Sequence, residues 1–346
     1  MRPNRPLAKR PVTLLSLTAL TAGSLLLAGC GGSASTEPSE AASAATAAPE
    51  ASDAASDAAS GAAVADPVSV VAAFYPLEYA ATRVGADAVT VTPLTPPGVE
   101  PHDLELSAAQ VAEIAAADVV LYIKGFQPAV DEAVEQQAAD RAIDVSAGLT
   151  LLAGEEGDHE GETEEEHAAH ADEGGNDPHV WLDPTNMAAI GAAIAERLST
   201  LAPDRAADIE AAAGTFEQDM TALDGEYTAA LATCASREMV VSHEAFGYLA
   251  NAYDLTQVGI SGLSPEAEPS PARMREVAEL VTANDITTIY YETLVDPKVA
   301  QTIADETGAS TAVLDPLEGL ASDASGDYSS IMRDNLATLV AGQSCT

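Results

Sequence analysis

Residues 203–234, PDRAADIEAAAGTFEQDMTALDGEYTAALATC, carry one helical pattern in the middle of the chain. Apolar side chains recur at every third or fourth position, which places them on one helix face: Ile209, Ala213, Phe216, Met220, Leu223, Tyr227 and Leu231. Pro203 stands in the first turn, where proline is favoured. A helix of this length spans roughly 45 Å, which exceeds the thickness of one small lobe. We therefore expect a stiff helix that joins two lobes.

Short β-branched runs alternate with helical patterns on both sides of this helix. Before it, the predicted strands are residues 68–74, 88–94, 118–123 and 142–145, and one helix is predicted at 107–117. After it, the predicted strands are 238–243, 254–260, 286–292 and 311–315, with helices at 270–284 and 297–308. This alternation favours an α/β fold of two similar lobes, each a parallel sheet flanked by helices.

The chain divides into five segments on this interpretation. They are a signal peptide (1–29), a lipidated Cys with a disordered tether (30–66), an N-terminal α/β lobe (67–200), the linking helix (201–235) and a C-terminal α/β lobe (236–346). The first segment has basic residues before an apolar run, as export signals do. That run ends in Leu-Ala-Gly-Cys, which resembles the bacterial lipobox. We expect Cys30 to carry a lipid that anchors the exported protein to the outer face of the cell membrane.

The charge of the chain is strongly acidic. Without residues 1–29 it carries 10 Lys and Arg against 55 Asp and Glu, a formal charge of −45. This charge disfavours nucleic acid as a partner and makes cations the natural class of ligand. Eleven acidic residues lie in a loop at 155–177, together with three histidines: His159, His167 and His170. The loop lacks apolar periodicity, so we predict a solvated arm that collects cations weakly.

The other three histidines, His102, His179 and His243, lie outside apolar helical faces, where a structural core histidine would belong. Each follows a predicted strand or sits in a rigid loop, and open α/β sheets bind ligands at the carboxyl ends of strands. Asp-Pro pairs at 177–178 and 183–184 restrict the backbone on both sides of His179. We predict that the three imidazoles converge on one Zn²⁺, because this ion takes nitrogen ligands in tetrahedral sites.

The fourth ligand is expected to be water or a carboxylate. The carboxylate candidates follow two predicted strands: Glu318, Asp315 and Glu292. The only tryptophan, Trp181, is expected to pack beneath the loop of His179. Three carboxylates are candidates to accept the hydrogen of a non-ligating imidazole nitrogen: Asp177, Asp183 and Glu244.

Two further cysteines, Cys234 and Cys345, form an even pair in a chain predicted to be exported, which favours a disulfide. Such a bond would join the C-terminus to the start of the last lobe. Enzyme motifs such as H-E-x-x-H, G-x-S-x-G and the P-loop are absent from the sequence. We therefore expect a binding protein rather than an enzyme.

Five motifs in a fixed order resemble those of the metal-binding lipoproteins of ABC importers for zinc and manganese. They are FYPLEYAA (74–81), PGVEPHDLELS (97–107), DPHVWLDP (177–184), SHEAFGYLA (242–250) and VLDPLEGL (313–320). The resemblance covers essentially all of residues 68–346 and includes the acidic, histidine-rich insertion. It implies two lobes joined by a rigid helix, with metal held between them by His102, His179 and His243.

The resemblance also bears on the choice of metal. Counted along the chain, the first three ligand positions are His102, His179 and His243. In manganese members the third position resembles a Glu and the fourth an Asp. This chain has a histidine at the third position, and its nitrogen favours zinc. Glu318 falls where some zinc members supply a fourth carboxylate, and we prefer it there. The implied function is capture of extracytoplasmic Zn²⁺, as cargo rather than cofactor, by a monomer that delivers it to an ABC permease. The alternatives are a manganese- or iron-binding importer component and an adhesin-like metal-binding lipoprotein.

Overall fold

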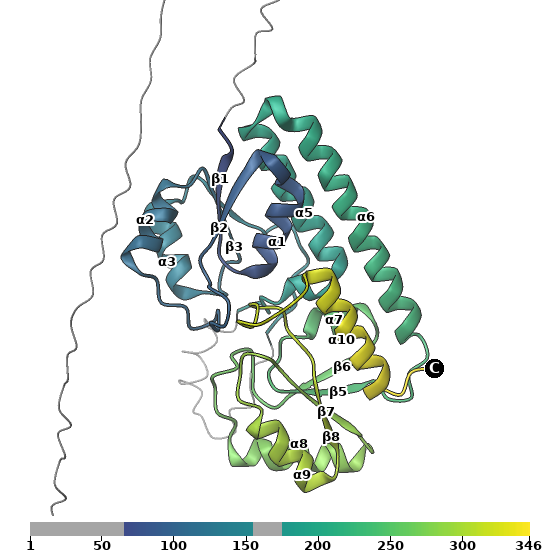
Figure 1. The fold of residues 1–346 in the computed structure, drawn as a ribbon. Coiled ribbons are helices and arrows are strands. Elements are labelled where there is room, and N and C mark those ends of the chain that lie inside the picture. Colours follow the sequence, from purple (N-terminus) through teal and green to yellow (C-terminus); the bar gives the residue numbers. More distant parts are fainter. Residues whose placement is uncertain (1–65, 155–174) are drawn as a thin grey trace, which may run out of the picture. The chain divides into compact units, whose positions relative to one another are not determined.

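The computed structural model describes residues 66–154 and 175–346 (Figure 1). The lipidation candidate Cys30 and three loop histidines lie outside the described residues: His159, His167 and His170. Within the two described ranges, no helix has both the length and the apolar character that a membrane span requires.

The first sheet has four parallel strands in the order β2-β1-β3-β4. They are β1 (Val68–Ala72), β2 (Val89–Pro93), β3 (Val119–Tyr122) and β4 (Ala142–Asp144). The helices between them are α1 (Tyr75–Gly85), α2 (Ala108–Ala116) and α3 (Pro128–Gln137). In the central strand β1, Val70 and Val71 point to opposite faces and both are buried, as expected of a parallel sheet covered on both sides.

The second sheet repeats the same order, as β6-β5-β7-β8, and all of its pairs are parallel. Its strands are β5 (Glu238–Val241), β6 (Thr256–Gly259), β7 (Thr288–Tyr291) and β8 (Ser310–Val313). The helices α7 (Gly247–Ala252), α8 (Pro271–Ala283) and α9 (Lys298–Thr307) lie between them in the chain. The prediction of two similar α/β lobes is confirmed.

The predicted long helix is shorter than the sequence pattern indicated. Residues 203–205 form a 3-10 turn, and Arg205 has φ −109° and ψ 1°, outside the α region, so α6 runs from Ala206 to Leu231. At 1.5 Å per residue it spans about 39 Å. The helix packs against α5 (Pro184–Leu201), α1 and the last helix, α10 (Tyr328–Gly342). It therefore contacts elements from both ends of the folded chain.

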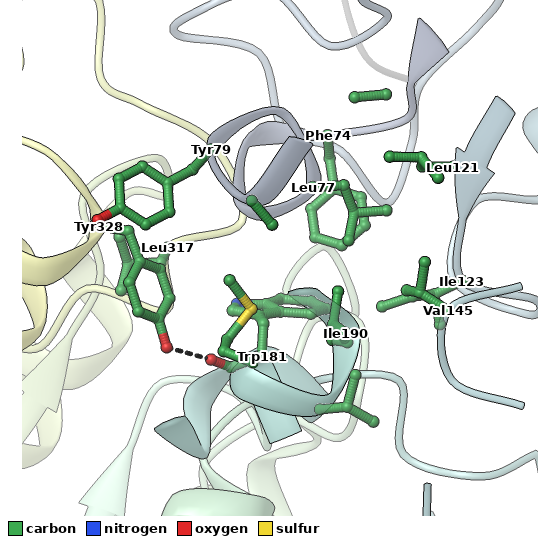
Figure 2. Packing of buried hydrophobic residues seen from close by; sticks show 14 of the residues in the cluster. Phe74, Leu77, Tyr79, Leu121, Ile123, Val145, Trp181, Ile190, Leu317 and Tyr328 are labelled. Carbon is green, nitrogen blue, oxygen red and sulfur yellow. Dashed lines mark hydrogen bonds between the residues drawn. The ribbon is translucent and has the colours of Figure 1, made fainter. Parts of the chain in front are cut away.

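A cluster of buried aromatic side chains connects distant parts of the chain (Figure 2). Phe74 and Trp181 meet with their ring centroids 4.7 Å apart, at an angle of 62°. The hydroxyl of Tyr328, at the start of α10, donates to the carbonyl oxygen of Trp181 at 2.6 Å, the dashed contact in Figure 2. This core supports the loops that carry the candidate ligands, since Trp181 lies two residues after His179.

The last residues of the chain are joined to the segment after α6, as the cysteine pairing predicts. Cys234 and Cys345 form a disulfide across a sequence separation of 111 residues. The bond fixes the end of α6 to the last residues of the chain, and the N–H of Ala235 donates to the carbonyl oxygen of Gln343 at 3.1 Å beside it.

Candidate metal centre

His102 lies in the loop that follows β2, and buried polar contacts hold this loop in place. The Gln127 side chain donates to the Thr95 hydroxyl at 3.2 Å and to the Pro101 carbonyl oxygen at 3.1 Å. The ring of Phe126 meets the imidazole of His102 edge-on, with centroids 4.7 Å apart. These contacts leave the ring of His102 little freedom before any ion binds.

His179 is fully buried at the start of a 3-10 turn, Val180–Leu182. Its backbone N–H and its Nδ1 both contact Asp177 Oδ1, at 2.9 and 2.7 Å. A carboxylate on Nδ1 places the hydrogen there, so that the lone pair of Nε2 faces the opposite side. The second Asp-Pro pair has a different role: Asp183 Oδ1 accepts the backbone N–H of Thr185 and so caps α5.

His243 follows β5 and is buried as well. Its Nδ1 lies 2.9 Å from Glu292 Oε1, and the Ser242 hydroxyl donates to the same oxygen at 2.6 Å. Glu292, a candidate fourth ligand from the sequence, therefore lies behind the ring of His243 rather than beside the other imidazoles. It orients Nε2 of His243 in the way that Asp177 orients His179.

Glu318 follows β8 in a loop with a strained turn. Leu317, just before it, has a φ of +57°, the left-handed region that side chains other than glycine seldom occupy. Asp315 Oδ1 accepts the backbone N–H of Leu317 at 2.8 Å. The Asn335 side chain of α10 accepts the N–H of Asp315 at 2.9 Å and donates to its carbonyl oxygen at 2.6 Å. Asp315, the other carboxylate candidate, thus shapes the loop, and Glu318 points to the histidines.

The ligand atoms of His102, His179, His243 and Glu318 lie within 4.8 Å of one another. Glu318 Oε1 lies 3.3, 3.1 and 2.9 Å from the three Nε2 atoms in that order, and the first two Nε2 atoms are 3.4 Å apart. A tetrahedron with metal–ligand distances of 2.0–2.1 Å has edges of about 3.3–3.4 Å. These four distances are therefore close to the edges of a zinc tetrahedron. No other such group is found in the described parts of the chain.

Burial and the neighbouring charges shift the pKa values of the group in opposite directions. Burial alone lowers the pKa of His243, but the nearby Glu318 and Glu292 outweigh it and hold that pKa well above its ordinary value. Burial likewise opposes ionisation of Glu318, yet His243 and the hydrogen bonds from the histidines hold its pKa well below the ordinary range. For His102, burial dominates and lowers the pKa. In the absence of a cation, these shifts favour a protonated His243 beside an ionised Glu318.

Sequence reasoning missed Glu100. Its Oε1 accepts the backbone N–H of His102 at 3.1 Å, and its Oε2 is buried with no hydrogen-bond partner among the described residues. Burial, together with the charge of Glu318, raises the pKa of Glu100 to about 8. Its position two residues before His102 is the only sequence signal that points to it.

A double α/β fold with a buried group of three histidines and one glutamate defines a metal-binding solute-binding protein of the kind that serves ABC importers. Residues 70–342 match the ZnuA family, described as "Zinc-uptake complex component A periplasmic", and the chain belongs to this family. The description of this family assigns its members to zinc uptake.

Individual relatives agree with this assignment. Over 285 residues the chain is 37% identical to "Zinc-binding protein AdcA" of Streptococcus pyogenes serotype M3, covering 79% of this chain and 55% of the relative. It thus spans about half the length of that relative. It is 33% identical to the "High-affinity zinc uptake system protein ZnuA" of Bacillus subtilis, covering 79% and 87% of the two chains. The Zn(II)-bound ZnuA-like domain of Streptococcus pneumoniae AdcA superposes with a TM-score of 0.66 at 33% identity, covering 80% of this chain and 99% of the domain.

Proposed function

We propose that this protein captures extracytoplasmic Zn²⁺ with His102, His179, His243 and Glu318 and delivers the ion to an ABC permease in the membrane. The observation that carries the proposal is the convergence of three Nε2 atoms and Glu318 Oε1 at distances close to the edges of a zinc tetrahedron. The relatives that bear zinc-binding or zinc-uptake names support it.

The ligand set favours zinc over manganese. Three of the four ligand atoms are imidazole nitrogens, which suit Zn²⁺, whereas the harder Mn²⁺ prefers sites richer in carboxylate and carbonyl oxygen. A single carboxylate, Glu318, also leaves the site with one negative charge against the two positive charges of the ion.

Binding requires that the imidazoles give up their protons. Burial opposes the charged form of His179, but its contacts with Asp177 and Glu318 outweigh burial and raise its pKa, as occurs for His243. Zn²⁺ therefore competes with protons for these two rings. Capture should release protons, and acidification should weaken it.

The proposal extends to the membrane anchor, the division into lobes and the oligomeric state of the protein. We infer that Cys30 is lipidated, that residues 31–66 tether the folded part to the outer face of the membrane, and that the lobes are residues 67–200 and 236–346 with 201–235 as their link. A monomer suffices, because one chain supplies all four proposed ligands. The histidines of the 155–177 loop would act as an auxiliary collector of zinc.

The test is a competitive titration of the purified, metal-stripped protein with Zn²⁺ and Mn²⁺ in the presence of a chelator of known affinity. We expect one tightly bound Zn²⁺ per chain and much weaker binding of Mn²⁺. His179→Ala should remove most of the zinc affinity. Zinc affinity that is unchanged by His179→Ala would contradict the proposed site, and a preference for Mn²⁺ would contradict the proposed cargo.

A further inference from the structure

A cavity of about 210 Å³ lies in the C-terminal lobe at the carboxyl ends of β5, β6 and β7. Much of its wall is apolar: Ile260, Tyr291, Val295, Val299 and Ala300. Two exposed glutamates of the segment between β6 and α8, Glu266 and Glu268, also line it. The cavity has many times the space that one water molecule needs, so it can receive a group of several heavy atoms.

Glu292 lines the cavity and is the direct link to the metal group. It is only 3% exposed. Its Oε1 contacts Ser242 and His243, whereas its Oε2 is buried and has no hydrogen-bond partner in the described residues. A buried carboxylate oxygen without a partner is unfavourable, and a donor that reaches it from the cavity would remove this cost.

The charges of the cavity favour a cationic occupant. Asp296, another lining residue, is paired with Lys298, but no ion pair is seen for Glu266 or Glu268 among the described residues. The cavity also lacks a preformed group of metal ligands, since the converging set lies at the histidines. Apolar walls combined with carboxylates suit a guanidinium or ammonium group on an aliphatic stem.

We propose that this cavity receives an Arg or Lys side chain of the membrane permease, and that this docking loosens His243 and promotes the release of zinc. The inference rests on the proposed function, which supplies the permease. The incoming cation donates to Glu292 Oε2 and draws the carboxylate toward the cavity. The contact between Glu292 Oε1 and His243 Nδ1 then lengthens, and the imidazole loses the carboxylate that orients it.

Coupling of this kind is reciprocal. If docking weakens zinc binding, zinc must weaken docking by the same factor, so the zinc-free protein binds the basic group more tightly. The cavity would thus help to confine release to the permease, where a basic side chain is presented at high local concentration.

The experiment measures zinc dissociation into excess chelator by stopped flow, with arginine methyl ester as the probe. We expect a saturable acceleration of about fivefold or more, the lower range of ordinary coupling between sites. Sodium chloride at matched ionic strength should not reproduce it. Absence of a saturable effect, or an equal effect of the salt, would overturn the inference.

Paired variants separate the cavity from general electrostatics. Glu266→Gln/Glu268→Gln should abolish the acceleration and leave the zinc affinity measured without the ester unchanged. Glu279→Gln/Glu306→Gln removes the same charge from exposed positions of α8 and α9 and should retain the acceleration. Acceleration that persists in the first variant, or is lost in both, contradicts the proposal.

The permease as the source of the basic group is tested in zinc-limited cells that lack the native gene. The Glu266→Gln/Glu268→Gln variant should fail to restore growth, whereas the Glu279→Gln/Glu306→Gln variant should restore it. Growth of both variants equal to wild type would exclude the permease as the occupant. A wild-type protein that does not bind zinc in the titration would instead reject the proposed function, and the two failures are therefore distinguishable.

Discussion

Trp181 Nε1 donates to the carbonyl oxygen of Pro316 at 2.7 Å and so joins the loop of His179 directly to the loop of Glu318. The two loops come from different lobes, and each carries one of the proposed ligands. The indole is fully buried and its ring centroid lies 5.2 Å from that of His179. The tryptophan is therefore both the apolar support of one ligand and the hydrogen-bond donor that positions the other.

Replacing this tryptophan tests the link between the loops. Trp181→Phe keeps a buried ring but leaves the Pro316 carbonyl without its donor, so we expect a loss of about 1–3 kcal/mol in unfolding free energy. Zinc dissociation should become faster because the Glu318 loop is less restrained. Chemical denaturation and stopped-flow release into a chelator measure the two effects.

Tyr328→Phe is the matched control, because it removes the hydroxyl that donates to the Trp181 carbonyl oxygen and leaves the Pro316 contact intact. This variant should lose stability without faster zinc release. Dissociation rates that are the same in both variants and in wild type would contradict a role for the indole in holding the site.

The two Asp-Pro pairs around His179 should respond differently to the same change. Asp177→Asn weakens the partner of His179 Nδ1, and loss of such an outer carboxylate lowers metal affinity about 10- to 100-fold. Asp183→Asn should have little effect on zinc or stability, since asparagine is also a good N-cap. Zinc titration of both variants measures their affinities, and an equal loss of zinc affinity in the two would refute the assigned roles.

The pH dependence of stability should reverse when zinc is bound. The pKa of His243 is raised above its ordinary value of 6.5, so its contribution to the zinc-free protein is complete below pH 6.5 and is lost as the pH rises through the raised pKa. The pKa of Glu318 is lowered below 4.5, so its contribution is present above pH 4.5 and is lost as the pH falls through the lowered pKa.

We therefore expect the melting temperature of the zinc-free protein to fall as the pH rises above 6.5. The increase in melting temperature produced by zinc should grow over the same interval, because the ion no longer competes with protons. Thermal unfolding from pH 5.5 to 9, with and without zinc, measures both. A zinc-induced increase that shrinks with rising pH would show that the histidines are not ligands.

The disulfide should stabilise the fold without shaping the site. Its loop of 111 residues corresponds to about 4–5 kcal/mol in the chain-entropy model. Cys234→Ser/Cys345→Ser should lower the unfolding free energy by up to this amount and leave the zinc affinity of the folded protein unchanged. Urea denaturation and zinc titration test the pair, and a tenfold loss of affinity would mean that the bond restrains the metal group as well.

The acidic, histidine-rich segment can be removed at points that lie close together. The N–H of Gly154 donates to the carbonyl oxygen of Gly175 at 3.0 Å, and the N–H of Asp177 donates to that of Leu152 at 2.9 Å. Replacing residues 155–174 by a short glycine linker should therefore keep the high-affinity site and slow zinc capture when zinc is scarce.

A second variant separates the histidines of this segment from its charge. Substituting alanine for His159, His167 and His170 retains the acidic residues, and we expect it to reproduce most of the loss in capture rate. Loss of high-affinity zinc binding on deletion of the segment would contradict the proposed location of the main site at His102, His179, His243 and Glu318.

The sequence predicted the repeated α/β pattern well because strand and helix periodicities report local burial. Ser107 illustrates this success, since its hydroxyl accepts the N–H of Gln110 in a capping box at the start of α2. The sequence pattern predicted the start of α6 less well, because Pro203 is compatible with both an α-helix and the 3-10 turn that is observed. It did not indicate α10, whose Asn335 holds the Glu318 loop.

By itself, then, the sequence determined most of the candidates for the chemistry, because rigid loops, histidines outside apolar faces and carboxylates after strands are all local patterns. Tertiary structure alone decided which of them meet. Glu318 lies among the imidazoles, Glu292 and Asp177 lie behind them, and Asp315 turns to the backbone. The physical reason is that periodicity along a chain specifies which face of an element is buried, whereas the meeting of two loops depends on how two sheets and a helix pack.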